Sequence, residues 1–208
     1  MAAGQLSRDD DLLRRVAAGD EWAFTALYHG YQKLVYRFAM QMSGSATIAE
    51  EATQEVFLAL MRQAAEFDPS RGRLSSWLYG IARNQVLRQL DRRSGWVGLD
   101  SGHQGDELDD LPPELPPELI ATFDPIEAMT QQEQSGALRR AIVSLPPHYR
   151  EAVVLCDLHE MSYAEAAVVT GCAVGTIRSR LHRARALLHG KLAARRPAAA
   201  CAKAPQGR

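Results

Sequence analysis

Arginine, serine and histidine side chains recur on one side of a predicted helix near the end of the chain. At about 100° per residue, Arg178, Ser179, His182 and Arg183 lie opposite an apolar face. Guanidinium, hydroxyl and imidazole groups can read base edges in the major groove, and cations on the flanks can hold phosphates. The pattern predicts a DNA-reading helix whose phosphate contacts are Thr176, Arg180 and Arg185.

The residues before this helix predict a helix-turn-helix. Ser162 and Glu165 have the S-x-x-E spacing of a capping box, and Gly171 can end the first helix in a left-handed conformation. The core face of the second helix is predicted to hold Ile177, Leu181, Ala184 and Leu188. The alternative is a solvated helix that happens to be basic. It is disfavoured because the segment carries no acidic residue for the i,i+4 pairs of an ordinary surface helix.

The charge of the chain is divided into blocks. The 208 residues carry 24 basic and 25 acidic side chains, for a net charge of -1. Residues 71–93 hold 6 basic and 1 acidic residue, residues 94–138 hold 0 and 10, and residues 166–208 hold 9 and 0. Two basic blocks flanking an acidic spacer predict two nucleic-acid-facing surfaces.

Several classes of function are disfavoured by the sequence. Cys156, Cys172 and Cys201 are too scattered for a disulfide framework and fit a reducing cytosol. Cys156, His159 and Cys172 lack an evident fourth metal ligand, so we expect no metal and no cofactor. Oxidation sensing by Cys156 or Cys172 is the weaker alternative to core packing. No apolar run approaches membrane-spanning length, the N-terminus lacks a signal-peptide core, and no residue cluster has catalytic spacing.

Three core helices are predicted in the first half. Asp20 can cap the first, whose aromatic and aliphatic side chains recur at helical spacing to about residue 42. The second spans about residues 47–65 and begins with a Thr47–Glu50 capping box. Its polar stripe consists of Glu51, Gln54, Glu55 and Arg62, with Leu58 among them. Leu58 is either a protein-docking residue or an ordinary surface leucine; the pattern alone favours neither.

A basic loop at residues 67–73 leads to the third helix, which Ser75 is predicted to cap and which ends near Arg93. Asn84 and Arg88 share its outer face with Trp77 and Ile81. Aromatic and basic groups beside a basic loop suit single-stranded nucleic acid, because bases stack and the backbone charge is neutralised. For Trp77 itself, burial against the preceding helices is the favoured alternative.

These segments define an all-α fold of two small helical domains joined by an acidic, proline-rich linker. We expect a disordered N-terminus at 1–8, a first domain at 9–95, the linker at 96–123, a second domain at 124–192 and a disordered basic tail at 193–208. The second domain is predicted to begin at Asp124-Pro125 and to contain a further helix at about residues 149–158.

The chain resembles the extracytoplasmic-function (ECF) class of bacterial RNA polymerase sigma factors. Residues 49–93 resemble region two of that family, through AEEATQEVFLALM and FDPSRGRLSSWLYGIARNQVLRQLDRR. Residues 145–188 resemble region four, through LPPHYREAVVLCDLHEMSYAEAAVVTGCAVGTIRSRLHRARALL. The resemblance implies a cytoplasmic, non-catalytic protein without a small-molecule substrate and not embedded in the membrane. The resemblance also implies binding to core RNA polymerase, at the β′ clamp helices and the β flap, to promoter DNA and to an anti-sigma factor.

The resemblance also implies roles for individual residues. The clamp-helix motif corresponds to Glu51, Gln54, Glu55, Phe57 and Leu58. Capture of the melting minus-ten element falls to Arg71, Arg73, Ser75, Arg83, Asn84 and Arg88. The minus-thirty-five element is read in the major groove by Arg178, Ser179, His182 and Arg183. The promoter sequence itself cannot be carried over.

Two rival functions remain open from the sequence. A stand-alone helix-turn-helix regulator would bind operators as a dimer without polymerase, although it needs no second nucleic-acid surface. An interaction module, such as an anti-sigma-type adaptor, would use its basic residues on an acidic protein and would have no sequence-specific effect on DNA.

Overall fold

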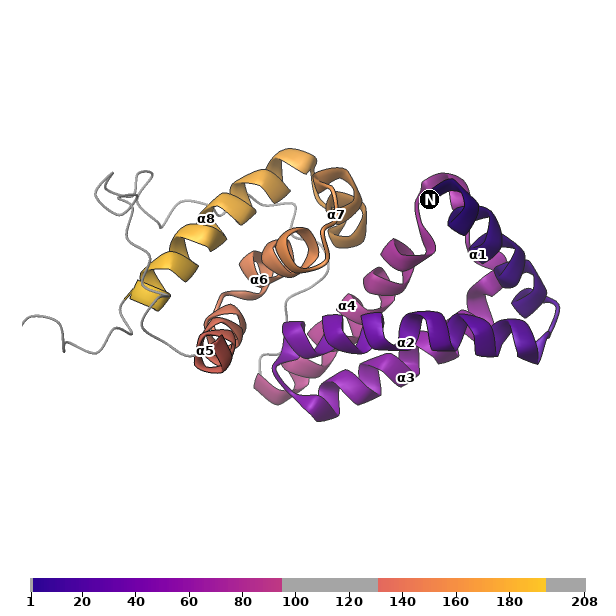
Figure 1. Ribbon diagram of the computed structural model, residues 1–208, viewed down its shortest axis with the longest axis horizontal. Helices are drawn as coiled ribbons and strands as arrows, with labels where there is room; N and C mark the ends of the chain where they lie inside the picture. Colours follow the sequence, from indigo (N-terminus) through magenta and orange to yellow (C-terminus); the bar gives the residue numbers. More distant parts are fainter. Residues whose placement is uncertain (1, 95–130, 194–208) are drawn as a thin grey trace, which may run out of the picture.

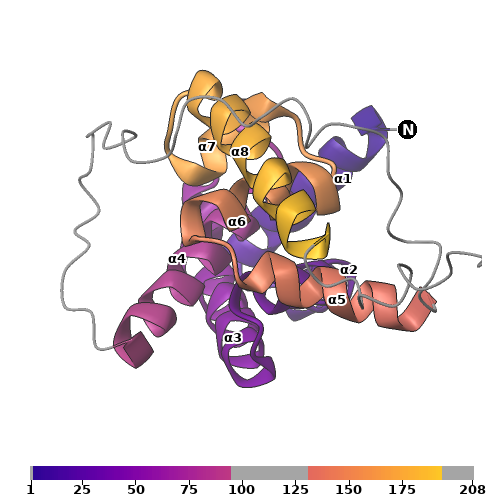
Figure 2. The ribbon, with the colours of Figure 1, turned by 90° about the vertical axis from the view of Figure 1, so that its left-hand side faces the viewer.

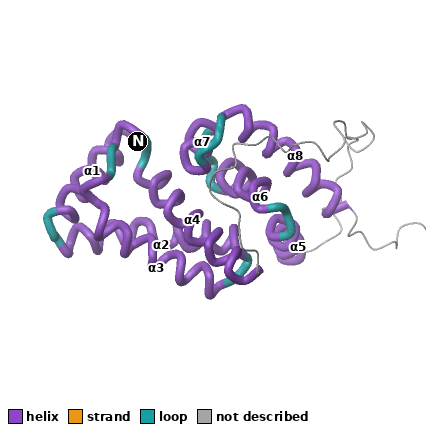
Figure 3. Tube along the Cα trace, turned by 180° about the vertical axis from the view of Figure 1, so that it is seen from behind, coloured by secondary structure: helices purple, strands orange, loops and turns teal. Residues whose placement is uncertain are grey.

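The computed structural model describes residues 2–94 and 131–193, and these residues are almost entirely helical. The N-terminal half contains α1 (Ala2–Ala17), α2 (Glu21–Ser43), α3 (Ala46–Gln63) and α4 (Leu74–Ser94), with the short 3-10 turns η1 (Ala64–Glu66) and η2 (Pro69–Arg71) before α4. The C-terminal half contains α5 (Gln131–Val143), α6 (Pro147–Val153), the π-helical turn η4 (Val154–Leu158), α7 (Tyr163–Thr170) and α8 (Val174–Ala193). No strand occurs in the described part of the chain, which confirms the all-α prediction (Figures 1 and 3).

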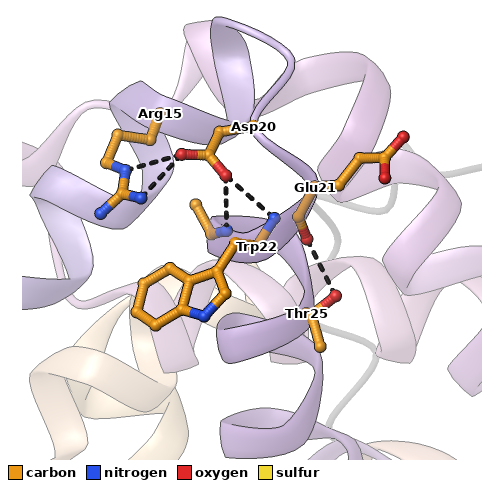
Figure 4. Close-up of polar contacts among 6 residues, drawn as sticks. Arg15, Asp20, Glu21, Trp22 and Thr25 are labelled. Atoms are coloured by element: carbon orange, nitrogen blue, oxygen red, sulfur yellow. Dashed lines mark hydrogen bonds and ion pairs between the residues drawn. The ribbon is translucent and has the colours of Figure 1, made fainter.

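The corner between α1 and α2 is fixed by one carboxylate. Asp20 accepts hydrogen bonds from the backbone N–H groups of Trp22 and Ala23 at 2.9 and 3.1 Å, as predicted for a cap (Figure 4). The other oxygen of Asp20 accepts from Arg15 at 2.7 Å, and the Arg15 guanidinium lies 5.0 Å from the centre of the Trp22 ring. The corner therefore joins α1 to the rest of the bundle.

Two predicted helix caps and one expected disordered segment differ from the structure. The expected disordered segment at residues 1–8 is helical from Ala2, as the first two turns of α1. Thr47 is no cap, because α3 begins at Ala46 after Ser45. Ser75 is likewise the second residue of α4 rather than its cap. Each of these two helices thus begins one residue before the predicted cap, since the sequence pattern shows only which residues are able to cap.

The remaining domain predictions fall partly outside the described residues. The acidic linker, the predicted Asp124-Pro125 helix start and the basic tail lie within 95–130 and 194–208. The helix predicted at about residues 149–158 is present as α6 and η4, and its residues Ala152, Val153 and Leu155 are buried. No helix of the described residues is long and apolar enough to cross a membrane.

The two halves share one continuous cluster of buried side chains. In the N-terminal half, α2 and α3 lie side by side and α4 packs across both; in the C-terminal half, α6 and α8 pack together with α5 and α7 around them. Helix α4 contacts α7, and α2 contacts α5 and α6 (Figures 1 and 2). As a result, the two predicted domains are in direct contact.

Candidate nucleic-acid interface

Helix α8 presents a polar face to solvent and an apolar face to the core. Its predicted core residues are all buried: Ile177, Leu181, Ala184 and Leu188. On the opposite side, Arg178, Ser179 and His182 are exposed, and the Ser179 hydroxyl donates to the Thr176 carbonyl at 3.0 Å. The packing of the apolar face fixes the helix rotation, so these three side chains all point outward.

Local hydrogen bonds fix the two ends of α7, which precedes α8. Ser162 Oγ accepts from the Glu165 N–H at 3.2 Å, and the Glu165 carboxylate accepts from the Ser162 N–H at 2.9 Å. This is the predicted capping box. Gly171 has φ of 71°, a left-handed conformation that costs glycine little, and its N–H bonds to the Ala167 carbonyl at 2.9 Å. The turn can then bring α8 back across α7.

The flanking residues of α8 are less accessible than the centre of its polar face. Thr176 and Arg180 are half-buried, and so is Arg183, which was predicted to read base edges together with Arg178. Arg185 is exposed, but its guanidinium forms two hydrogen bonds with Asp157, at 3.1 and 2.6 Å. These bonds raise the pKa of Arg185. As a phosphate contact, Arg185 would have to leave Asp157 or share its donors with it.

The face of α4 and the loop before it surround a cavity of about 360 Å³. Trp77 is half-buried and lies edge-on to Phe67, with ring centres 5.7 Å apart, so the favoured burial of Trp77 is only partial. Asn84 is exposed at the cavity rim, and the α7 residues Val168 and Val169 contribute to the lining. The buried Ser76 hydroxyl at the cavity has no hydrogen-bond partner among residues 2–94 and 131–193. A planar base could stack on the aromatic wall and find polar groups beside it.

Two predicted DNA-binding arginines of this face are already paired. Arg83 Nε lies 2.9 Å from Oε1 of Glu151 on α6, and the Glu151 side chain is only 3% exposed. Arg73 Nε lies 3.4 Å from Oε1 of Glu165 on α7. Of the remaining predicted minus-ten residues, Arg88 is exposed, Ser75 is half-buried, and the side chain of Arg71 is outside the described part.

The predicted polymerase-docking stripe borders a groove of about 700 Å³ between α2 and α3. Gln54, Glu51 and Leu58 are exposed on α3, and Glu55 is half-buried with a 3.8 Å ion pair to Arg62. The groove is lined by tyrosines of α2 together with Leu58, Met61 and Phe57. Phe57 differs from the expectation of a surface contact, because its ring is buried against Tyr28 with centres 4.7 Å apart. The buried Phe57 ring therefore forms part of the inner wall of the groove.

Sequence reasoning missed the residues that join the two halves. His159 bonds through its two ring nitrogens to Tyr79 and Gln41, both at 2.8 Å. The buried Arg150 donates to the backbone carbonyls of Met42, Val143 and Leu145. One signal was available, since Arg150-Glu151 is a charged pair directly before the apolar run Ala152–Leu155. Charged residues that pack inside a helix layer need partners from another element.

The cysteines and the metal question can be addressed within residues 2–94 and 131–193. No cluster of three or more histidine, cysteine, aspartate or glutamate residues in these segments could hold a metal ion. Cys156 and Cys172 are half-buried free thiols, and burial raises the pKa of the Cys156 thiol to about 11. A raised pKa lowers the thiolate fraction, which disfavours Cys156 as an oxidation sensor.

A helical bundle with a cavity beside α4, followed by a helix-turn-helix, is the architecture of a two-part DNA-binding protein. Family models match both parts: sigma-70 region 2 at residues 27–95 and sigma-70 region 4 at residues 135–188. Curated relatives agree. The ECF RNA polymerase sigma factor SigM of Mycobacterium tuberculosis is 33% identical over 180 residues, which cover 86% of this chain and 82% of that protein. SigW of Bacillus subtilis is 28% identical, with coverage of 86% and 94%.

Two further comparisons concern length and fold. SigE of Mycolicibacterium smegmatis is 34% identical over 180 residues, which cover 85% of this chain. The chain spans 65% of the length of that protein. The structure of CnrH in complex with the cytosolic domain of CnrY shares the fold, with a TM-score of 0.64, 23% identity and coverage of 91% and 99%. The sigma factor RpoE in complex with the anti-sigma factor NepR from Bartonella quintana gives a TM-score of 0.59, with 25% identity and coverage of 83% and 98%.

The chain belongs to the ECF sigma factors of the sigma-70 family. Promoter recognition is the general function of this family, and a stand-alone helix-turn-helix regulator is not favoured.

Proposed function

We propose that this protein binds core RNA polymerase and directs it to promoters through separate contacts with the minus-thirty-five and minus-ten elements. The observation that carries the proposal is the orientation of α8. Its buried apolar face fixes Arg178, Ser179 and His182 on the opposite, exposed side of a helix-turn-helix. An exposed helix of this composition fits the major groove.

The minus-ten element is assigned to α4 and the loop before it. Support comes from the cavity beside Trp77, which offers aromatic surface, the Asn84 amide and the unpartnered Ser76 hydroxyl. These groups suit a base that has left the duplex as the promoter melts. Arg73, Arg83 and Arg88 would neutralise the neighbouring phosphates once the first two leave their carboxylate partners.

Core polymerase is assigned to the α3 stripe and the groove beside it. Leu58 is 39% exposed among polar side chains, and Met61 is 56% exposed at the same groove. An apolar groove rimmed by carboxylates and an amide suits a helical surface with basic residues, as the resemblance implies for the β′ clamp helices. The β flap would contact the C-terminal half.

The protein would act without catalytic chemistry of its own, in the bacterial cytoplasm, where polymerase and chromosome lie. Its activity would be restrained by an anti-sigma factor, as in the RpoE complex with NepR.

Run-off transcription tests the proposal. Purified core bacterial RNA polymerase is incubated with a genomic fragment library, with and without this protein. Discrete start sites that depend on the protein are expected, and they would reveal both promoter elements at once. Glu55→Arg reverses a charge on the α3 stripe and should reduce co-elution with core polymerase, whereas the exposed Glu160→Arg on the other half should not. No new start sites together with separate elution would contradict the proposal.

A further inference from the structure

The cavity beside Trp77 takes its walls from both halves of the chain. Along α4 the lining residues recur at helical spacing: Ser76, Trp77, Gly80, Ile81 and Asn84. Phe67, in the loop before α4, and Val168 and Val169, on α7, form further walls. We call this space the interhelix cavity. Its volume of about 360 Å³ lies within the range of small-molecule sites, which is about 300–1,000 Å³.

Gly80 leaves space in this cavity that a side chain would occupy. In the described part of the chain, no packed neighbour lies within 4 Å of the position that a Cβ would take at Gly80. Close packing therefore does not require a glycine here, and its helical backbone does not require one either. Glycine destabilises a helix interior relative to alanine. The missing side chain thus has a structural cost, and its result is open space beside Trp77.

The interhelix cavity also contains a buried polar group that the described residues do not satisfy. Ser76 is only 5% exposed, and no residue that the structure describes forms a hydrogen bond with its hydroxyl. Such a hydroxyl is unfavourable until a bound molecule satisfies it. Farther along the same side of α4, the exposed Asn84 carries an amide that can donate and accept. Together these groups suit the edge of a ligand that carries both donors and acceptors.

The other walls of the cavity are apolar or aromatic. Trp77 and Phe67 lie edge to face, with ring centres 5.7 Å apart. Val168 and Val169 of α7 add aliphatic surface. Aromatic walls favour a flat ring system, which can stack on the Trp77 indole while the valines cover it.

The charged residues of the cavity disfavour an anionic ligand. Glu66 and Asp68 line it and are both exposed, so the cavity opens to solvent on their side. Arg73 also lines it, but its guanidinium lies 3.4 Å from the Glu165 carboxylate, which balances its charge. A phosphate group at this opening would be repelled by the carboxylates. An uncharged ligand is therefore favoured over its phosphorylated form.

We propose that the interhelix cavity binds a small, uncharged, planar heteroaromatic molecule of the size of a purine nucleoside. The ring system stacks on Trp77 and packs against Val168 and Val169, and its edge satisfies the Ser76 hydroxyl and the Asn84 amide. The proposal goes beyond the proposed function of α4, because this binding requires neither polymerase nor promoter DNA. A free nucleoside and a base of a melted strand share the same chemistry, so the two compete for the cavity.

Equilibrium dialysis of the full chain against adenosine tests the proposal. We expect a dissociation constant of about 0.1 mM, and about tenfold weaker binding of adenosine monophosphate because of the carboxylates. Gly80→Leu fills the cavity and should weaken adenosine binding by at least about tenfold. Gly30→Leu is the matched control, since the same side chain enters open space on α2 and should leave binding unchanged. Ser76→Ala removes the hydroxyl and should weaken binding about fivefold.

Trp77 fluorescence shows whether adenosine lies in this cavity. Trp22→Phe and Trp96→Phe leave Trp77 as the sole tryptophan of the chain. Adenosine stacked on Trp77 should quench its emission with the dissociation constant found by dialysis. Absence of adenosine binding at millimolar concentration would overturn the proposal. Binding without a change in Trp77 emission, or binding that Gly80→Leu and Ser76→Ala both leave unchanged, would place the ligand elsewhere and would also overturn it.

A single-stranded oligo(dA) separates the two sources of a base. Its displacement of adenosine from Trp77 would support a shared site. If oligo(dA) quenches Trp77 and adenosine does not, the cavity accepts a DNA strand alone and the proposal fails. Transcription that depends on this protein, without adenosine binding, would refute the nucleoside site and leave the proposed function intact. Adenosine binding without such transcription would support the nucleoside site and refute the proposed function.

Discussion

The two predicted DNA-binding surfaces of this chain differ in what surrounds them. On α8, the outward side chains Arg178 and His182 meet solvent, and the buried side of the helix supplies their support. On α4, Arg83 faces the other half of the molecule and is paired with a buried carboxylate. Both helices are basic, but one surface is available in the free chain and the other is covered.

This difference shows that a basic helix face is not by itself an open binding site. Arg178 and Arg83 are the same residue type on well-formed helices of one protein. Their accessibility is set by a neighbour far away in sequence, since Glu151 is 68 residues from Arg83. The accessibility of the covered surface therefore depends on that neighbour, whereas the accessibility of the open surface does not.

The largest effect on the free energy of unfolding is expected at the buried apolar face of α8. Leu181→Ala removes a side chain that is 2% exposed beneath α8 and should lower the free energy of unfolding by about 3 kcal/mol. Val174→Ala, at the exposed start of the same helix, should change it by less than about 0.5 kcal/mol. Urea denaturation measures both values. If both variants lose similarly little free energy of unfolding, α8 does not pack on the core as described.

Removing one reading group from the open surface should weaken promoter selection. Arg178→Ala is expected to cost about 1–3 kcal/mol at a contacted base pair, because a bidentate contact is lost. Lys191→Ala removes a basic side chain farther along the same helix and serves as the control. Transcription from promoters with single substitutions in the minus-thirty-five element provides the readout. If Arg178→Ala leaves promoter selectivity unchanged, α8 does not read the minus-thirty-five element.

The free energy of unfolding should depend on pH through His159, which lies at the contact between the two halves. Burial, with the positive charge of Arg37 nearby, lowers the pKa of His159 to about 4. The folded chain then binds fewer protons than the unfolded chain between about pH 6.5 and 4, so stability is fully present above this window and is lost as the pH falls through it. After allowing for its partial exposure, we expect a loss of about 1 kcal/mol at pH 5.

Thermal or urea unfolding at pH 7 and pH 5 measures this loss. His159→Gln retains hydrogen-bonding groups toward Tyr79 and Gln41 but cannot titrate, so its pH dependence should be smaller. The exposed His189→Gln should behave like the wild type. An equal pH dependence in all three proteins would show that His159 is solvated and that the halves are apart.

The smallest effect is expected at the flank of α8. Asp157→Asn weakens the ion pair between Arg185 and Asp157, whose side chains are 58% and 30% exposed, and should change the unfolding free energy by less than about 1 kcal/mol. Freed from Asp157, Arg185 should strengthen binding to duplex DNA slightly and increase its salt dependence. A fluorescence titration at several salt concentrations follows both effects. Weaker binding would mean that Asp157 positions Arg185 for the phosphate.

The open surface could be predicted because its determinants are local. The Ser162–Glu165 cap, the Gly171 turn and the apolar repeat from Ile177 to Leu188 lie within 27 residues and specify the buried and exposed sides of α8 together. Short-range hydrogen bonds and helical periodicity are sufficient for such a unit.

The covered surface could not be predicted in the same way. The helical pattern placed Asn84 and Arg88 on the outside of α4 but contained nothing about Glu151, which approaches from another half of the chain. The Thr47 and Ser75 caps were wrong, because α3 begins at Ala46 and α4 begins at Leu74, each one residue before the predicted cap. Sequence periodicity reports which side of a helix is apolar, and it does not report what packs against the polar side.

The contrast between the two surfaces can be measured directly in one sample of the free, unmodified chain. Limited modification of arginines by phenylglyoxal, followed by mass spectrometry, gives the rate for each guanidinium group. Arg178 should react about as fast as the exposed Arg62, and Arg83 should react slowly, closer to the buried Arg150. Equal rates for Arg83 and Arg178 would contradict the account, because they would show that α4 is uncovered in solution.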